Sequence, residues 1–367
     1  MIWLSLLILA ACQATPDPAP GAEVLAGDVV AGGVDLAIDD SGTAWISWVA
    51  DDEVFVARSD GGSFTPGKSI GVGDRTPSVG TARRPRLAVD DERIAVAFSD
   101  GVTPDAEIWL YVADKTTLDF SGQLLAETGR HDTLDQPTLA FDGGEIHVAW
   151  KFGLDHDYGI AIGRESDNYT PVEVYGFPGQ PCECCPHELT MVDSDVVLVQ
   201  RGNELDLREI YLGFVDDAGQ AEVHRVSQND WLVAGCPYDG PSTTRTDSGR
   251  WLATWIDATL GDARAWVSAS DDGGVTWGAG LVVLPDGDRS QAWPNLTSNG
   301  DDVWLTVEEI WLRTRLFHSG DGGMSFEEQT MDEDIVDTQL ASGGGRAGMI
   351  GLDRDDHLVW WALGSPP

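Results

Sequence analysis

Apolar and polar residues alternate along most of the chain after residue 12, and Val, Ile and Trp are enriched at the apolar positions. This alternation is typical of β-strands with one buried face, and no segment after residue 12 has the period of an amphipathic helix. One phrase recurs: an apolar strand after Pro or a polar residue, a turn, and a second strand that often ends in an aromatic residue. Copies begin at about residues 34, 85, 137, 186, 241, 294 and 339. The pattern predicts an all-β chain built from repeats.

Two segments near the C-terminus share a short motif. Residues 270–277 (SDDGGVTW) and residues 319–326 (SGDGGMSF) both follow S-x-D-x-G-x-[ST]-aromatic. In such an octet the Asp side chain can accept hydrogen bonds from backbone amides of its own turn, and the glycines supply positive φ. The closing aromatic ring can pack under the hairpin. Each octet therefore predicts a tight hairpin turn, and their spacing favours a repeat architecture.

The octets resemble the Asp-box of the sialidase-like (BNR-repeat) β-propellers. That resemblance implies a propeller of four-stranded blades over residues 23–365. The seven phrases indicate seven blades, with six as the alternative because the sialidases have six. The seventh copy ends after its third strand, and residues 23–25 (EVL) stand where a fourth strand would precede the first copy. We therefore expect the N-terminal strand to close the ring, which removes exposed sheet edges.

The chain is strongly acidic, with 22 Lys and Arg against 62 Asp and Glu and a formal net charge of −40. This excludes nucleic acid as a partner, because its recognition needs cationic groups that neutralise phosphates. Asp is a common turn residue, so a solvated acidic surface accounts for the charge. A high-salt habitat, or Ca²⁺ at the Asp-rich loops, is the alternative. We expect a monomer.

The N-terminus is a separate segment. Residues 1–11 are an apolar run that ends in small residues before Cys12, which resembles the lipobox of a bacterial lipoprotein. The run is too short to span a bilayer as a stable helix. The resemblance implies a signal peptide over residues 1–11 and a lipidated (palmitate-bearing) Cys12, and residues 12–22 then form a Pro-rich tether. Because Gln13 follows the cysteine, we expect an outer-membrane lipoprotein, periplasmic or at the cell surface.

Four more cysteines precede two successive innermost strands. Residues 181–187 (PCECCPH) come before the fourth strand phrase, and residues 235–241 (GCPYDGP) come before the fifth. Equivalent positions in adjacent blades are neighbours near the axis, so all four sulfurs can meet. The CxCCP and CPxxGP pair resembles a subset of bacterial BNR-repeat proteins. The set is Cys182, Cys184, Cys185 and Cys236.

Two interpretations of this cluster remain open. An even number of cysteines outside the cytoplasm favours two disulfides. A bond between Cys184 and Cys185 would be strained, so Cys236 would pair with one of the other three. The alternative is a thiolate site for Cu(I) or Zn²⁺, with His187 as an added ligand, since four sulfurs have the right number and softness.

The blade geometry predicts which face is functional. First-to-second and third-to-fourth turns share one face with the octets, while second-to-third loops and blade connections share the opposite face with the cysteines. Cations gathered on that second face favour an anionic ligand, because guanidinium groups bind carboxylates bidentately. The alternative is that they pair with the abundant Asp and Glu. The candidate ligand-binding residues are Lys151, Arg201, Arg208, Arg264 and Arg313, with Arg83 and Arg84 on the same face.

Three functions fit these features. The first is a surface module that binds glycan or another anionic ligand. The second is an exo-acting glycosidase of sialidase type, which needs paired carboxyls or a Tyr nucleophile with a base. Tyr238, Asp257 and Glu308 are its candidates, although the sialidase phrase [FY]-R-I-P is absent and Arg84-Pro85 is only a weak echo. The third is a Cu- or Zn-binding protein built on the four cysteines.

Overall fold

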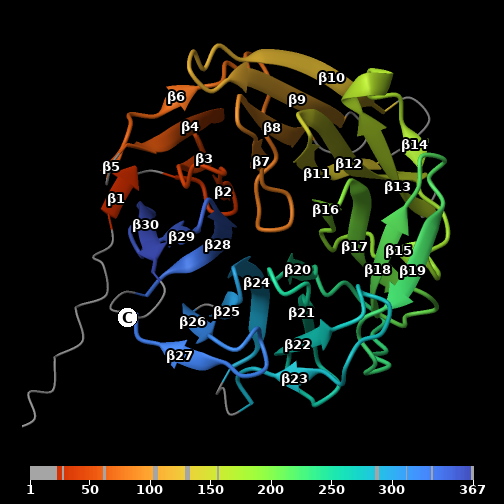
Figure 1. Cartoon of the computed structure of the whole chain (residues 1–367). Helices are drawn as coiled ribbons and strands as arrows, with labels where there is room; N and C mark the ends of the chain where they lie inside the picture. The colour runs from red at the N-terminus through yellow and green to blue at the C-terminus, as the bar shows by residue number, and fades with distance from the viewer. Residues whose placement is uncertain are drawn as a thin grey trace, which may run out of the picture.

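The computed structural model shows a ring of seven antiparallel sheets around a central axis (Figure 1). It describes residues 23–26, 29–60, 63–101, 106–128, 133–154, 157–285, 289–310, 312–331 and 334–364. The expected signal peptide, Cys12 and the tether lie outside the described residues. The described helical structure is the 3₁₀ turn η1 (Glu165–Asp167), and no described helix is long and apolar enough to cross a bilayer.

Each sheet is one blade of a propeller, which confirms the all-β prediction and the count of seven. Blade I comprises β2 (Asp35–Ile38), β3 (Ala44–Ala50), β4 (Glu53–Asp60), β5 (Ser63–Phe64) and β6 (Lys68–Ser69), and blade II comprises β7 (Arg86–Val89), β8 (Arg93–Asp100), β9 (Glu107–Asp114) and β10 (Ser121–Glu127). Blade III comprises β11 (Thr133–Asp142), β12 (Glu145–Leu154), β13 (Asp157–Arg164) and β14 (Val172–Glu173). Blade IV comprises β15 (Gln180–Pro181), β16 (Glu188–Val192), β17 (Asp195–Asn203), β18 (Ile210–Val215) and β19 (Ala221–Arg225).

The remaining blades follow in chain order. Blade V comprises β20 (Ser242–Arg245), β21 (Trp251–Asp257), β22 (Arg264–Ser270) and β23 (Leu281–Val282), and blade VI comprises β24 (Gln291–Asn299), β25 (Asp302–Glu309), β26 (Arg313–Ser319) and β27 (Glu327–Gln329). Blade VII comprises β28 (Val336–Gly343), β29 (Arg346–Leu352), β30 (Leu358–Leu363) and, from the other end of the chain, β1 (Glu23–Ala26).

The N-terminal strand closes the ring, as the sequence predicts. β1 pairs antiparallel with β30, with Glu23 opposite Trp360 and Val24 opposite Val359. This pairing covers the outer edge of the last blade, which would otherwise present unpaired backbone groups. It also joins the first and last described strands of the chain within one sheet (Figure 1).

The hydrophobic core lies between the blades rather than in a single centre. Trp45 and Val56 of blade I pack with Ile94 and Phe98 of blade II, and a comparable buried cluster occupies each of the seven junctions among the described residues. Middle strands are therefore buried on both faces. β21, for example, is buried along its whole length. This explains why the strand phrases contain short continuous apolar runs as well as alternation.

Both Asp-box octets form the third-to-fourth turn of their blades. Asp272 accepts hydrogen bonds from the Thr276 hydroxyl (2.6 Å) and backbone amide (2.8 Å), and these bonds lower its pKa to about 2. Asp321 makes the equivalent bonds with Ser325, and its pKa is likewise lowered to about 2. The octets thus fix hairpins on one face, here called the Asp-box face. The blade connections and second-to-third loops form the opposite face, here called the mouth.

A ring of polar side chains near the start of the innermost strands links successive blades. In four of the junctions a side-chain oxygen of one strand accepts a hydrogen bond from a backbone amide of the next innermost strand. We call these residues the inner collar. The pairs are Asp35 with Leu87 (2.8 Å), Glu188 with Thr243 (2.8 Å), Ser242 with Leu296 (3.1 Å) and Asn295 with Leu340 (3.1 Å).

The collar predicts the effect of an Asn295→Ala substitution. It removes the acceptor for the buried Leu340 amide, and an unsatisfied buried N–H costs about 1–3 kcal/mol. We expect the free energy of unfolding, measured in urea, to fall by about that amount. Asn299→Ala, at the other end of β24, is the matched control and should change it by less than about 0.5 kcal/mol. Equal losses in the two variants would contradict a role for the collar.

Candidate functional site

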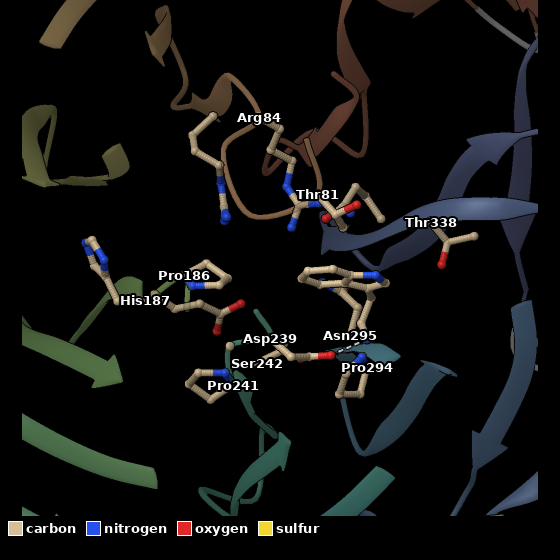
Figure 2. A pocket seen from close by; sticks show the side chains of 15 residues that line it. Thr81, Arg84, Pro186, His187, Asp239, Pro241, Ser242, Pro294, Asn295 and Thr338 are labelled. Carbon is tan, nitrogen blue, oxygen red and sulfur yellow. Dashed lines mark hydrogen bonds between the residues drawn. The ribbon is translucent and has the colours of Figure 1, made fainter. Parts of the chain in front are cut away.

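A narrow pocket lies on the propeller axis at the mouth, where the innermost strands begin. It encloses about 380 Å³ of space between atoms, its open end included. Its walls come from blades II, IV, V, VI and VII, so no single blade builds it. Figure 2 shows Arg84 reaching toward the centre of this pocket, with Asp239 opposite and His187 at its edge.

Arg84 is the most unusual residue of the pocket. It is 9% exposed, and its Nε and Nη1 have no hydrogen-bond partner among the described residues. The closest carboxylate contact is Asp35, at 3.9 Å. Burial lowers the pKa of Arg84, although an arginine keeps its charge under all ordinary conditions. A buried guanidinium with free donors is costly unless an acceptor satisfies them, so this pocket is suited to an oxyanion.

The carboxyls around Arg84 carry less negative charge than their number suggests. Burial raises the pKa of Asp239 to about 7, and it also raises the pKa values of Glu188 and Asp337. Asp239 accepts a hydrogen bond from the Trp293 amide (2.7 Å), while its other oxygen has no partner among the described residues. Near pH 7 the pocket can therefore hold a protonated acid beside a fixed cation, which favours an anionic ligand.

Backbone bulges interrupt three of the innermost strands at the mouth, and one of them places Trp293 in the wall of the axial pocket. The ladders of blades III, VI and VII shift register at the start of their innermost strands, next to Gln136, Trp293 and Asp337. All three residues have positive φ, near 50°. Bulges of this kind redirect a side chain out of the regular alternation and are common beside binding sites. They also explain why these three innermost strands start a few residues before the predicted phrases.

The predicted ligand-binding cations lie at the mouth, but their side chains donate hydrogen bonds to other groups of the protein. Lys151 is 1% exposed, and its Nζ donates to the Gln136 side chain (2.7 Å) and to the carbonyls of Cys182 (2.7 Å) and Cys185 (2.5 Å). Burial lowers its pKa to about 7. Arg201 donates to the carbonyls of Asp239, Arg208 and Ile256, and burial lowers its pKa to about 10.

The other three predicted cations also contact carbonyls or carboxylates of the protein. Arg208 donates to Glu183 (3.3 Å) and to the Gly235 carbonyl (3.0 Å). Arg264 donates to the Ala263 and Arg289 carbonyls, and Arg313 lies 3.3 Å from Glu309. The alternative, in which these cations pair with Asp and Glu, describes Arg208 and Arg313, whereas Lys151 and Arg201 donate to carbonyl and amide oxygens. Arg84, which the sequence placed on the same face, lines the axial pocket and keeps two nitrogens without a hydrogen-bond partner among the described residues.

The three predicted catalytic residues, Tyr238, Asp257 and Glu308, differ in their hydrogen bonds, exposure and suitability for proton transfer. Asp257 accepts bonds from Asn229 (2.5 Å) and from the backbone and hydroxyl of Thr259, so its oxygens hold a loop. Tyr238 is partly exposed and packs edge-on against Trp293. Glu308 is suited to proton transfer, because burial raises its pKa to about 7. Glu308 also helps to raise the pKa of Asp239, a residue that the sequence did not single out.

The structure brings the four cysteines together. It pairs Cys182 with Cys185 and Cys184 with Cys236, and the sulfurs of Cys182, Cys184 and Cys185 lie within 4.8 Å of one another. His187 does not join this group; it lines the axial pocket, and burial lowers its pKa well below the usual value. Among the described residues, these sulfurs are the one cluster with metal-ligand spacing, and no Asp-rich loop forms a comparable Ca²⁺ site.

A second hollow lies beside the cysteine loop, between blades III and IV. It has about 1100 Å³ of space between atoms, and its walls carry the aromatic residues Phe152, Tyr158, Tyr175 and Phe177. A Cβ at Gly159 would meet the Phe152 ring at 2.5 Å, and one at Gly213 would meet the Phe177 ring at 2.5 Å, so both rings lie directly on glycine backbone. Tyr175 is 56% exposed. We call this hollow the aromatic groove.

Comparisons with known proteins agree on the fold. No protein-family model and no curated protein sequence matches the chain. Among solved structures, a polysaccharide lyase of family PL25, an ulvan lyase bound to -[GlcA(1-4)Rha3S]-, shares 13% identity with a TM-score of 0.56, covering 93% of this chain and 95% of the lyase. The SapL1 lectin in complex with α-methyl fucoside shares 12% with a TM-score of 0.51, over 83% and 98% of the two chains. An intramolecular trans-sialidase from Ruminococcus gnavus shares 11% with a TM-score of 0.46, over 90% and 94%.

At these identities the likenesses show the fold alone, and the likeness to the trans-sialidase is too distant to support an argument. The structure is a seven-bladed propeller, and its neighbours among solved structures include proteins that bind or process glycans. The residues that the sequence missed are Asp239 and Trp293. A usable signal was present: Asp239 stands just before the innermost strand of blade V, and Trp293 lies in the first residues of the innermost strand of blade VI, where side chains line the axial pocket.

Proposed function

We propose that this protein binds an acidic glycan at the mouth of the propeller, with a carboxylate or sulfate of the glycan in the axial pocket. The observation that carries the proposal is the buried Arg84 guanidinium, whose Nε and Nη1 have no partner among the described residues. The Nε–H and Nη1–H groups lie on different edges of the guanidinium, so an oxyanion would accept from one of them together with Nη2 and form the bidentate, charge-assisted pair that arginine favours. The partly protonated Asp239 opposite could donate to the same anion.

The aromatic groove supports a glycan rather than a free small anion. Sugar rings present apolar C–H faces that pack on aromatic rings, while amide and carboxyl groups fix their hydroxyls. The groove supplies Tyr175 and Phe177 beside Gln180 and Asp157. Pro181 lines the groove and Pro186 lines the axial pocket. Because five residues of chain span at most about 18 Å, these two prolines, and hence the two sites, lie within about that distance of each other. A short oligosaccharide could reach both.

The bound ligands of the structural neighbours are consistent with this proposal. The ulvan lyase holds an oligosaccharide that contains glucuronate and a sulfated rhamnose, and the lectin holds a fucoside. They illustrate that a propeller can present such a site. The proposal for this chain rests on its own Arg84. We propose that the protein acts as a monomer, because each site is built within one ring.

Arg84→Gln tests the axial pocket. The substitution keeps a polar side chain but removes the charge, and a hydrogen bond to a charged group contributes about 1.5–3 kcal/mol. We expect the affinity for glucuronate, measured by calorimetry, to fall about 10- to 100-fold. Glucose should bind the wild-type protein more weakly than glucuronate does, because it lacks the carboxylate.

Arg346→Gln is the matched control, since Arg346 stands at the β28–β29 turn on the Asp-box face. Its affinity for glucuronate should equal that of the wild-type protein. Equal binding by Arg84→Gln, or equal binding of glucose and glucuronate, would refute the proposed role of Arg84. A glycan array with uronate-bearing, sulfated and neutral oligosaccharides then identifies the preferred class.

One observation favours a second function, hydrolysis of a glycoside. Glu308 and Asp239 both have a pKa raised to about 7, and Glu308 contributes to the shift of Asp239. Glycosidases require two carboxyls that flank one sugar position, one protonated as the acid and one ionised as the base or nucleophile. Tyr238, which packs on Trp293, is the available nucleophile for a sialidase-type variant.

Glu308→Gln tests this function with fluorogenic glycosides, a sialoside included. If Glu308 is a general acid, turnover should fall at least about 100-fold in the variant. Wild-type turnover should decline as pH rises through about 7, because the acid then loses its proton. Tyr238→Phe separates a Tyr nucleophile from a carboxylate mechanism. Turnover that persists in both variants would mean a contaminating enzyme, and no turnover at all would leave binding as the function.

We also propose that the protein is a lipoprotein anchored through Cys12, outside the cytoplasm and at the outer membrane. The support is the apolar run of residues 1–11 that ends at this cysteine. Cys12→Ser should move the protein from the detergent-requiring membrane fraction to the soluble fraction, as detected by immunoblot, and abolish palmitate labelling. A soluble wild-type protein, or a variant that still labels, would contradict lipidation at Cys12.

A further inference from the structure

The cysteine loop is held in place by side chains as well as by sulfur bonds. Lys151 donates to the carbonyls of Cys182 and Cys185, and Gln136 donates to the carbonyl of Cys184 (3.0 Å). The Cys182 amide in turn donates to the Arg201 carbonyl (2.8 Å). Each of the three cysteines in this loop is therefore anchored through its backbone to blade III.

The segment that carries Cys236 is anchored to the same loop. Arg208 donates through one nitrogen to the Gly235 carbonyl and through another to the Glu183 carboxylate. One buried guanidinium thus ties the residue before Cys236 to the residue between Cys182 and Cys184. Arg201 continues this network, because it donates to the carbonyls of Arg208 and Asp239.

This network is expected to hold the sulfurs near one another even without S–S bonds. The Cys182 and Cys184 sulfurs are 3.8 Å apart, and the Cys185 sulfur lies within 4.8 Å of both. A tetrahedral thiolate site with Zn–S bonds of about 2.3 Å places its sulfurs about 3.8 Å apart. Cys236 is more exposed than the other three cysteines and is joined to this group by its disulfide with Cys184. The loop thus has the dimensions of a metal-thiolate site, with a fourth ligand available from the next blade.

We infer that the four cysteines, when reduced, bind one thiophilic metal ion, Zn²⁺ or Cu(I), and that the two disulfides are the oxidised, metal-free form of the same site. Thiolates are the ligands that both ions prefer. A dithiol reductant converts each disulfide into two thiols and leaves with its own sulfurs oxidised. The ion then displaces the thiol protons into solvent. The charges of Arg201 and Arg208 offset part of the negative charge that four thiolates bring.

The inference is independent of glycan binding, because it uses neither Arg84 nor the aromatic groove. It is tested on the full chain carrying Cys12→Ser, which removes the fifth thiol. The protein is reduced anaerobically, its four thiols are counted, and it is titrated with Zn²⁺ or Cu(I) against a chromophoric chelator. We expect one ion per chain, and competition between the two ions identifies the preferred one. The reoxidised protein should bind none.

Three variants sharpen the test. Cys184→Ser should abolish stoichiometric binding, because Cys184 belongs to the three-sulfur group. Lys151→Met should weaken binding about 10- to 100-fold, because it removes the donor that holds the Cys182 and Cys185 carbonyls. Lys68→Met should have no effect, because Lys68 forms an exposed ion pair with Asp119. Far-ultraviolet circular dichroism verifies that each reduced protein is folded.

Two results would overturn the inference. One is a folded protein with four titrated thiols that binds no ion at one equivalent, or binds it equally well after Cys184→Ser. The other is loss of the native spectrum on reduction, since the side-chain network would then be unable to hold the cysteine segments without disulfides. Either result would assign the cluster a purely structural role as two disulfides.

Discussion

The structure depends on closing a ring around an axis that must remain partly polar. Seven apolar junctions hold neighbouring blades together, but the innermost strands converge where backbone amides have little access to water. The inner collar meets this constraint by giving several of those amides a side-chain acceptor on the preceding blade. Because the collar residues are polar, the axis becomes a place where charged groups can be buried. The axial pocket with Arg84 is a consequence of how the ring closes.

Two buried cations of this acidic chain satisfy backbone carbonyls rather than pair with Asp or Glu. Arg201 donates to three carbonyls and Lys151 to two, at positions where loops of neighbouring blades meet. Carbonyls at such junctions lack strand partners, and a buried side chain with several donors can satisfy more than one of them. This use of cations makes the contrast with Arg84 informative, because its free nitrogens cannot be explained by a junction that needs donors.

The sequence predicted the fold well because its signals are periodic. The repeated sequence pattern predicted the starts of β2, β7 and β20 to within one residue. It also assigned residues 23–25, which precede the first repeat, to the last blade, where β1 pairs with β30. The site was predicted less well because it depends on side-chain direction. Lys151 and Arg201 were placed on the right face, but their strands turn them into the protein rather than toward solvent. The bulges at Gln136 and Trp293 were not predicted, because their positive φ falls on residues other than glycine, which is the usual marker of this conformation.

Long-range electrostatics and short-range contacts act in opposite directions on an anionic ligand. A protein with a formal charge of −40 repels anions at a distance, although salt screens that repulsion beyond about 8 Å at physiological ionic strength. Inside the narrow pocket the interaction with Arg84 is screened far less, because water is largely excluded. In the proposed complex a free small anion would gain that contact alone, whereas an acid group on a glycan would also gain the packing of its sugar rings in the aromatic groove. The proposed site would therefore select acid groups that are carried on a larger, mostly neutral scaffold.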